Sequence, residues 1–532
     1  MLQASARRGA RPLLEVCLAN PLFATKPLSL LLEEMKGENR LRRVLGPTQL
    51  TSLGVGAVIG TGIFVLTGQA AHDRAGPALI VSFVAAGIAC IFAALCYAEF
   101  ASMVPVAGSA YTYAYATLGE LFAWIIGWDL ILEYAVASMT VAHGWSKNFQ
   151  DSLAVFGVHL PKTLANSPFD YDPATGHFFG TGSVLDLPGI AIAVLVTWVL
   201  VIGIKESARF NTTMVVIKVA IVLFVIAVGA FYVNPANWHP FAPYGYTGMS
   251  FFGHTLFGQT DKGGQPLGAL AGAAVIFFAY IGFDSISTHA EEAKNPRRDV
   301  PIGIIASLVI CTVLYIAVSA ILTGMVPYHE INIETPVSDA FRRAGLPWAR
   351  LLISLGAMTG ITSVLLVMML SQPRVWLAMA RDGLFPESFF GAVHPKYRTP
   401  WKATILTGVV VAAGAAFLPL RVLADLTNIG TLFAFVVVCA AVLIMRRTNP
   451  NAERPFRAPL GVFVPVAGIV TCMILMLSLA KENWYRLFIW LAIGFVIYFA
   501  YGRKHSVMAR LAAAKAVPVP AAAQRAQPSS SS

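Results

Sequence analysis

The sequence predicts an all-α polytopic membrane protein with twelve transmembrane helices, and three observations support this fold class. Of the 532 residues, 57% are hydrophobic and only 12% are charged, which is about half the charged fraction of soluble domains. The hydrophobic residues gather in segments of about 20, the length that a helix needs to cross a bilayer. Two of these segments are interrupted by glycines, and they take equivalent places in two successive sets of five.

Twelve segments have the length and composition of membrane-spanning helices. Their approximate bounds are 49–71, 77–101, 121–145, 186–204, 211–233, 267–289, 301–326, 351–380, 403–419, 424–445, 461–480 and 487–502. Residues 106–120 (VAGSAYTYAYATLGE) predict a re-entrant or surface helix between the second and third. Lysine and arginine are concentrated in both terminal segments and in most of the alternate loops, which predicts a multi-pass protein of the cell (inner) membrane with both termini in the cytoplasm.

These segments divide the chain into six parts. The predicted parts are a cytoplasmic N-terminal segment (1–48), a first five-helix repeat (49–233), an extracytoplasmic loop (234–266), a second five-helix repeat (267–445), two further helices (461–502) and a cytoplasmic tail (503–532). The tail ends in the low-complexity stretch AAAKAVPVPAAAQRAQPSSSS. Such a composition does not form a packed core, so we expect the tail to be disordered.

The first predicted helix contains GVGAVIGTGIF at residues 54–64, and its four glycines weaken a helix interior by up to about 1 kcal/mol each. The sixth is interrupted at Gly282, and the polar residues Asp284 and Ser285 follow. Interrupted helices at equivalent positions of two repeats indicate an inverted-repeat transporter that binds its substrate there. For Gly56 and Gly60 the alternative is close helix packing, because they have the GxxxG spacing.

A broken helix is tolerated at the bilayer midplane only where it is buried in protein or lines a cavity. The N–H groups freed at such a break, at the start of a half-helix, bind an anion such as a carboxylate. The freed carbonyl groups bind a cation such as an ammonium. An α-amino acid carries both groups on one carbon, so the two breaks together favour an amino acid substrate.

Among the ionisable residues inside predicted spans are Lys218, Asp129, Glu133 and Asp284, and an ionisable side chain at such a place is a functional candidate by default. Lys218 lies eight residues into the fifth span, and the cost of burying its ammonium makes it a candidate for proton exchange. Its alternative role is to reach the cytoplasmic interface with its long stem. Glu133 follows Asp129 by four residues, so both share one helix face. Glu133 could pair with Lys218, attract a cationic substrate side chain, or be a protonated packing residue. Asp284 is expected to cap the restarted half-helix.

Four stretches carry a resemblance to a known family: GVGAVIGTGIFVLTG, KESARFNTTMVVIKVAIV, VIFFAYIGFDSISTHAEEAKNPRRDVPIGI and QPRVWLAMARDGLFP. Over about residues 24–505 the sequence is similar to bacterial members of the cationic amino acid transporter (CAT) family. This family belongs to the amino acid–polyamine–organocation (APC) superfamily. The resemblance implies a LeuT-type fold, a 5+5 inverted repeat in which helices 1 and 6 are discontinuous.

The resemblance also implies roles for individual residues. The amides of Thr61 and Gly62 would hold the substrate carboxylate, carbonyls of the sixth helix would hold the amino group, and Met368 would cap the side-chain pocket. Lys218 would occupy the place where sodium-coupled relatives bind sodium, so that coupling would be to protons, with Glu133 as a second proton-coupling candidate. The expected substrate contacts are Ile59, Gly60, Thr61, Gly62, Ile63, Phe278, Ala279, Tyr280, Ile281, Gly282 and Met368.

The expected function is proton-coupled uptake of L-amino acids by alternating access, and the alternative is a proton-independent amino acid exchanger. The sequence contains no GxSxG, HExxH or Walker A motif and no metal-spaced His/Cys cluster, so we expect no enzyme activity, no metal and no cofactor beyond a proton gradient. Expected partners are the substrate, protons and membrane lipid, without nucleic acid. A disulfide-linked heavy chain is not expected, because residues 146–185 contain no cysteine. The oligomeric state is left open.

Overall fold

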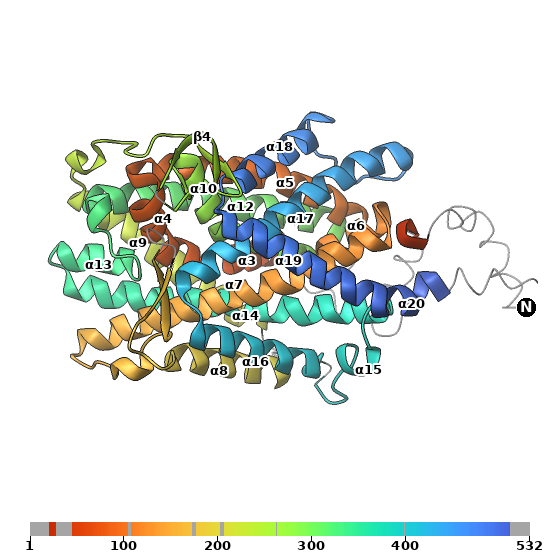
Figure 1. Ribbon diagram of the computed structural model, residues 1–532, viewed down its shortest axis with the longest axis horizontal. Coiled ribbons are helices and arrows are strands. Elements are labelled where there is room, and N and C mark those ends of the chain that lie inside the picture. The colour runs from red at the N-terminus through yellow and green to blue at the C-terminus, as the bar shows by residue number, and fades with distance from the viewer. Residues whose placement is uncertain are drawn as a thin grey trace, which may run out of the picture.

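The computed structural model describes residues 21–27, 45–104, 108–172, 177–202, 207–261, 263–397 and 399–510. In this part of the chain, helices form an elongated bundle in which most of the long helices run along the long axis (Figure 1). The fold is therefore mostly helical, as predicted.

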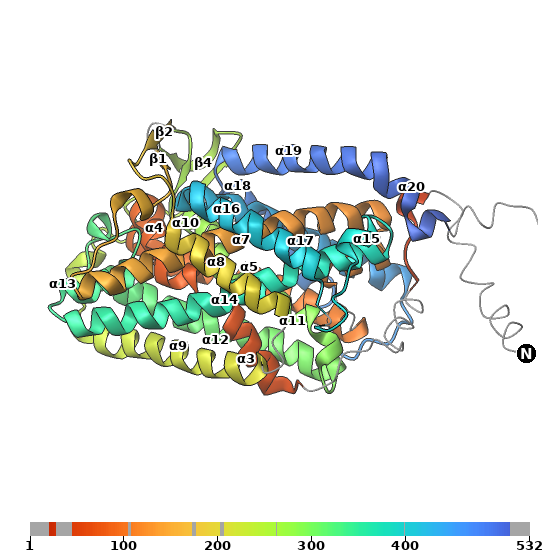
Figure 2. The ribbon, with the colours of Figure 1, turned by 90° about the horizontal axis from the view of Figure 1, so that it is seen from below.

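The α-helices are α3 (Pro47–Val58), α4 (Thr67–Ala70), α5 (Leu79–Met103), α6 (Ser109–Thr117), α7 (Glu120–Val155), α8 (Leu187–Ile202), α9 (Ser207–Gly229), α10 (Ala269–Ile276), α11 (Ser285–Thr288), α12 (Pro296–Met325), α13 (Pro336–Arg343), α14 (Pro347–Arg381), α15 (Glu387–Phe390), α16 (Trp401–Phe417), α17 (Leu420–Thr448), α18 (Phe463–Leu477), α19 (Lys481–Ile497) and α20 (Arg503–His505). Short 3-10 helices and π-helical turns join them, among them η3 (Gly62–Leu66), η4 (Ala71–Ala75), η5 (Gly76–Ala78) and η9 (Phe277–Tyr280). α4 and α13 lie toward one end of the bundle, and α15 and α20 lie at the other (Figures 1 and 2).

Eight helical stretches among the described residues are long and apolar enough to cross a membrane. The first, Pro47–Met103, covers two predicted spans, because short helical turns join α3 to α5 without a loop. Three further apolar helices, α8, α16 and α18, are shorter and have 10–17 residues. The stretch Ala269–Thr288 is the most completely buried of the eight, so the sixth predicted span lies at the centre of the bundle.

Two loops contain strands, and the prediction of a purely α-helical chain is wrong there. β1 (Phe169–Asp172) and β2 (His177–Gly180) pair antiparallel. β3 (Gly248–Phe251), β4 (His254–Thr260) and β5 (Pro266–Leu267) form a small antiparallel sheet in the order β3-β4-β5. Phe252 and Gly253 both have positive φ between β3 and β4, the conformation that a tight hairpin connection requires.

Two helices are longer in the structure than predicted, because polar residues can continue a helix when their side chains are buried or hydrogen-bonded. α7 continues to Val155, ten residues past the predicted end, and Asn148 and Ser152 in this extension donate to carbonyls one turn back. α19 begins at Lys481 rather than at 487 and therefore includes Arg486. Both extensions bring polar side chains into the bundle.

The first and last described segments meet at Asp382, directly after α14. Lys26 forms an ion pair with the Asp382 carboxylate (2.9 Å), and the Val507 amide donates to the Asp382 carbonyl (2.9 Å). Ser506 donates to Glu120 at the start of α7. Residues 503–510 therefore do not fit the expected disorder of the tail, whereas residues 511–532 and most of the predicted N-terminal segment lie outside the described residues.

Candidate functional site

The first membrane helix is broken at Ile59, within the glycine-rich stretch. α3 ends at Val58, and Ile59 is extended (φ −73°, ψ 105°). The amides of Ile63 and Phe64 both return to the Gly60 carbonyl (3.2 Å each), where the helix restarts. Residues 61 and 62 therefore begin a new helix, and the first N–H groups of a helix have no acceptor within it.

The sixth membrane helix is also broken. α10 continues into η9, and Ile281 is extended (φ −58°, ψ 130°). Gly282 follows with φ +120°, a conformation that glycine adopts without the steric cost of a side chain. A Cβ at Gly282 would also lie 2.8 Å from the Ala57 carbonyl oxygen. The predicted discontinuity of both helices is thus present, and the two breaks lie against each other.

The contact between the breaks is close at Gly62 and is bridged by Tyr315. A Cβ at Gly62 would lie 2.3 Å from Ala279 Cα, so only glycine allows this approach. The Tyr315 hydroxyl, on α12, lies 2.8 Å from the Val58 carbonyl oxygen and 3.0 Å from that of Ala279, and can donate to either. The predicted contact residues 59–63 and 278–282 therefore face one another. Gly60 also allows close helix packing, as the alternative predicted, because a Cβ there would lie 2.5 Å from a methyl group on α14.

Lys218 lies on α9 and is completely buried. Its Nζ donates to the carbonyls of Gly56 (2.5 Å) and Ile59 (2.9 Å) on the broken first helix. Its third hydrogen bond goes to Ser363 Oγ on α14 (2.8 Å), so all three ammonium donors have acceptors. The alternative in which Lys218 reaches the interface does not occur, because its ammonium lies on the helix break.

Glu133 does not pair with Lys218 and lies in a different polar cluster. Glu133 and Asp129 on α7 are each 1% exposed, and none of their carboxylate oxygens has a hydrogen-bond partner among the described residues. The Arg486 guanidinium on α19 is opposite in charge and interacts electrostatically with both carboxylates. Glu133 therefore remains a proton-coupling candidate, but it makes no hydrogen bond to either helix break among the described residues.

Asp284 was expected to cap the restarted half-helix, and that prediction is wrong. The side chain makes no capping hydrogen bond to α11. Its Oδ1 instead accepts from the Gly282 amide (3.2 Å), and its Oδ2 accepts from the Tyr134 hydroxyl on α7 (3.1 Å). Asp284 thus fixes the break itself and ties it to α7.

Met368 is buried on α14. It follows Val364 by one helical turn, and Val364 is the side chain that contacts Gly60. Residues four apart share a helix face, so Met368 lies on the face of α14 that is turned toward the first helix.

Three residues that hold the breaks were not identified from sequence. Tyr315 and Ser363 are described above, and the Asn428 side chain on α17 donates to the carbonyls of Ala274 (2.9 Å) and Val275 (3.1 Å) at the end of α10. A polar side chain in an apolar span needs a buried partner. The sequence could therefore have indicated that these three residues form buried hydrogen bonds, but it does not predict which carbonyl group each residue contacts.

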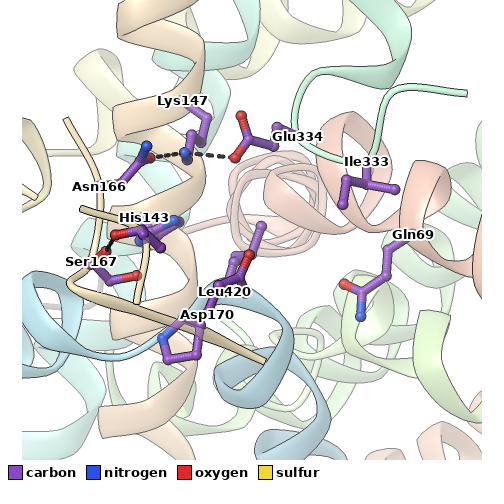
Figure 3. A pocket seen from close by; sticks show the side chains of 11 residues that line it. Gln69, His143, Lys147, Asn166, Ser167, Asp170, Ile333, Glu334 and Leu420 are labelled. Carbon is purple, nitrogen blue, oxygen red and sulfur yellow. Dashed lines mark hydrogen bonds and ion pairs between the residues drawn. The ribbon is translucent and has the colours of Figure 1, made fainter. Parts of the chain in front are cut away.

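A separate polar cavity of about 80 Å³ lies toward the α13 end of the bundle (Figure 3). Figure 3 shows Lys147 of α7 between Asn166 and Glu334, with Gln69 of α4 across the opening. Close by, the buried Asp186 carboxylate lies 3.2 Å from His143 Nδ1. Burial raises the pKa of Asp186 from 3.8 to about 6, although hydrogen bonds from Ser146 and the Gly189 amide oppose this.

Comparisons with known proteins give the family. A family model described as amino acid permease matches residues 45–498. The methylthioribose transporter of Bacillus subtilis (strain 168) is 46% identical over 92% of this chain and 99% of its own length. The branched-chain amino acid permease BcaP of the same organism is 47% identical over 91% of this chain and 98% of its own. The vacuolar cationic amino acid transporter 4 of Arabidopsis thaliana is 40% identical over 78% and 65%.

The family model spans nearly all of the helical bundle, including both broken helices, and the relatives are named as permeases and transporters. The predicted resemblance is confirmed, and the absence of an enzyme activity follows from the family. The chain is a multi-pass membrane transporter that belongs to the amino acid permease family of the APC superfamily.

Proposed function

We propose that the protein takes up L-amino acids together with protons, by alternating access to a site between the two broken helices. Amides of Thr61 and Gly62 bind the substrate carboxylate, and carbonyls of Phe278, Ala279 and Ile281 bind its ammonium. Release of the proton held on Lys218 is coupled to movement of the first helix. The runner-up is a proton-independent exchanger with the same site.

The arrangement of helices supports a LeuT-type fold with twelve spans. The stretch Pro47–Met103 contains two spans, and the seven other long stretches with the three short apolar helices bring the number to twelve. The breaks fall in the first and sixth of these, as in a 5+5 inverted repeat. The first and last described segments meet at Asp382, which supports termini on one side of the membrane, and the distribution of lysine and arginine favours the cytoplasm.

The observation that carries the coupling proposal is the buried Lys218 ammonium on the carbonyls of Gly56 and Ile59. A charged ammonium satisfies these carbonyls and holds the first helix in one position. A neutral amine has fewer protons to donate and releases that hold. Protonation thus biases a two-state equilibrium, and a ligand biases such an equilibrium only through its different affinity for the two states.

Symport and exchange are distinguished by uptake into proteoliposomes with an empty lumen. A symporter concentrates radiolabelled substrate when an inward proton gradient is imposed, and the gradient disappears as substrate accumulates. An exchanger needs internal substrate and does not respond to the gradient. Uptake that requires a preloaded lumen and ignores pH would overturn the coupling proposal and leave exchange.

The substrate is identified by a thermal-shift screen of the purified protein. A ligand at a hundred times its Kd stabilises the folded protein by about 2.7 kcal/mol, which is easily measured. The screen covers all proteinogenic L-amino acids together with methylthioribose, since one relative is named as its transporter. Two helix breaks that offer both amides and carbonyls favour a zwitterion, so we expect stabilisation by amino acids. Stabilisation by methylthioribose alone would contradict the substrate class.

A further inference from the structure

The polar cavity near α13 lies outside the site between the broken helices and is lined by charges of both signs. Its volume of about 80 Å³ corresponds to roughly five to eight water molecules. The five heavy atoms of an amino acid head group need about this much room. Lys147 supplies a positive charge, and Glu334 and Asp170 supply negative charges.

The Lys147–Glu334 ion pair crosses this cavity (Figure 3). Lys147 Nζ lies 2.6 Å from Glu334 Oε1, and the side chains are 6% and 51% exposed. Lys147 also donates to the Asn166 side chain. Because Lys147 is buried, its charge is costly without an anionic partner. Any movement that separates the pair must therefore give Lys147 another anion.

The pair closes over the second half of the broken first helix. Gln69 follows Gly62 by seven residues on that helix, about two turns, and reaches the cavity. It is 5% exposed, and its Oε1 has no hydrogen-bond partner among the described residues. The segment that carries Glu334 packs on the same helix, since a Cβ at Gly68 would lie 2.7 Å from the Asn332 carbonyl oxygen.

We propose that this cavity is a second binding site, for a zwitterionic α-amino acid on its way to or from the central site. The substrate carboxylate replaces Glu334 at Lys147, and the substrate ammonium is held by Glu334, with the free Gln69 oxygen as a further acceptor. The inference rests on the proposed amino acid substrate.

The chemistry of the pair selects this class of ligand. A zwitterion replaces the ion pair with two new pairs, so no charge is left unpaired when Lys147 and Glu334 separate. A simple anion would satisfy Lys147 but gain nothing from Glu334 or from the buried Gln69 oxygen, and a neutral sugar would leave the Lys147 charge without an anion. The substrate therefore opens the contact between α7 and the segment before α13 by occupying it.

The test counts bound substrate by equilibrium binding of radiolabelled L-leucine to the purified full chain. We expect two equivalents in the wild type and one in each of Lys147→Met and Glu334→Gln, which keep the central site. Gly62→Ala, which blocks the central site, should also retain one. Lys162→Met and Glu330→Gln are matched controls, since both residues are exposed and neither lines the cavity, and both should retain two.

Each outcome decides the proposal. One equivalent in the wild type, unchanged in Lys147→Met and absent in Gly62→Ala, would overturn the second site and leave the central site standing. Absence of leucine, alanine and arginine binding in every variant would overturn the amino acid assignment and the second site with it. Glu334 is half exposed, so Glu334→Gln keeps the comparison decisive if Lys147→Met does not fold.

Discussion

The close approach of the two helix breaks at Gly62 leads to a quantitative prediction for Gly62→Ala. The added Cβ would lie 2.3 Å from Ala279 Cα and 2.4 Å from Ala279 Cβ, whereas ordinary contacts begin at 3.4 Å. The Ala279 Cα belongs to the backbone and the Cβ adjoins it, so no flexible side chain can move aside. The two breaks must therefore separate by about 1 Å.

The magnitude follows from the hydrogen bonds that this separation lengthens. An amide–carboxylate bond of about 2.9 Å becomes about 3.9 Å, which is no longer a hydrogen bond. Bonds to a charged group contribute about 1.5–3 kcal/mol each, so losing two costs about 3–6 kcal/mol. At 1.4 kcal/mol for each factor of ten, substrate Kd should rise by about 10²–10⁴.

The assay is radiolabelled substrate binding to purified protein, at the central site of Gly62→Ala and of a matched control. Gly180→Ala is that control, because a Cβ at Gly180 would meet nothing within 4 Å. The control should bind as the wild type does. If Gly62→Ala protein elutes as a single species and binds substrate at the central site within threefold of the wild-type Kd, the close contact at Gly62 does not set the geometry of substrate binding.

Three further predictions concern separate parts of the structure. Tyr315→Phe removes the hydroxyl between two buried carbonyls and should lower the free energy of unfolding by about 1–3 kcal/mol, whereas Tyr97→Phe, which removes a buried hydroxyl that has no hydrogen-bond partner in the described part of the chain, should not; equal losses in denaturant melts would contradict the bridge. Met368→Ser shortens a buried side chain and should raise uptake of arginine or lysine relative to alanine; an unchanged competition profile would show that Met368 faces elsewhere. Asp186 has its pKa raised from 3.8 to about 6, so between these values the folded state holds a proton that the unfolded state has lost. Its contribution to stability therefore falls as pH rises from about 4 to 6, by up to about 3 kcal/mol; Asp186→Asn should lose this slope in melting curves recorded across that range, and an unchanged slope would exclude Asp186 as its source.

The helix breaks could be predicted from sequence because their cause is local. Glycines interrupt apolar segments at 54–62 and 282, and glycine both weakens a helix and permits a positive φ. The structure shows the breaks where these residues stand. Burial of Lys218 could likewise be predicted, since it follows from its depth in an apolar span. The two-stranded and three-stranded sheets could not, because their loops have little periodicity to indicate strands.

The partners of these residues could not be predicted, because a single sequence does not say which helix faces share a contact. The acceptors of Lys218 lie near the end of α3, at the break that follows it and on α14, and the alternative of a Lys218–Glu133 pair had the same support from sequence. The predicted last span begins at residue 487 and leaves out Arg486, because the search for a continuous apolar segment excludes a charged residue. In the structure Arg486 lies within α19. The cavity around Lys147 is built from segments more than 200 residues apart, which only the fold brings together.

Proton-driven uptake by Lys218→Met in proteoliposomes shows directly whether the buried ammonium couples transport to protons. This substitution roughly keeps the side-chain volume and removes the ammonium from the carbonyls of Gly56 and Ile59. Radiolabelled substrate is followed at equal and at unequal pH, beside the wild type. We expect the variant to retain substrate binding, because the contacts at both helix breaks remain, and to lose acceleration by an inward proton gradient. If Lys218→Met still concentrates substrate when driven by the pH difference alone, Lys218 is not the coupling residue, and its hold on the first helix does not couple transport to protons.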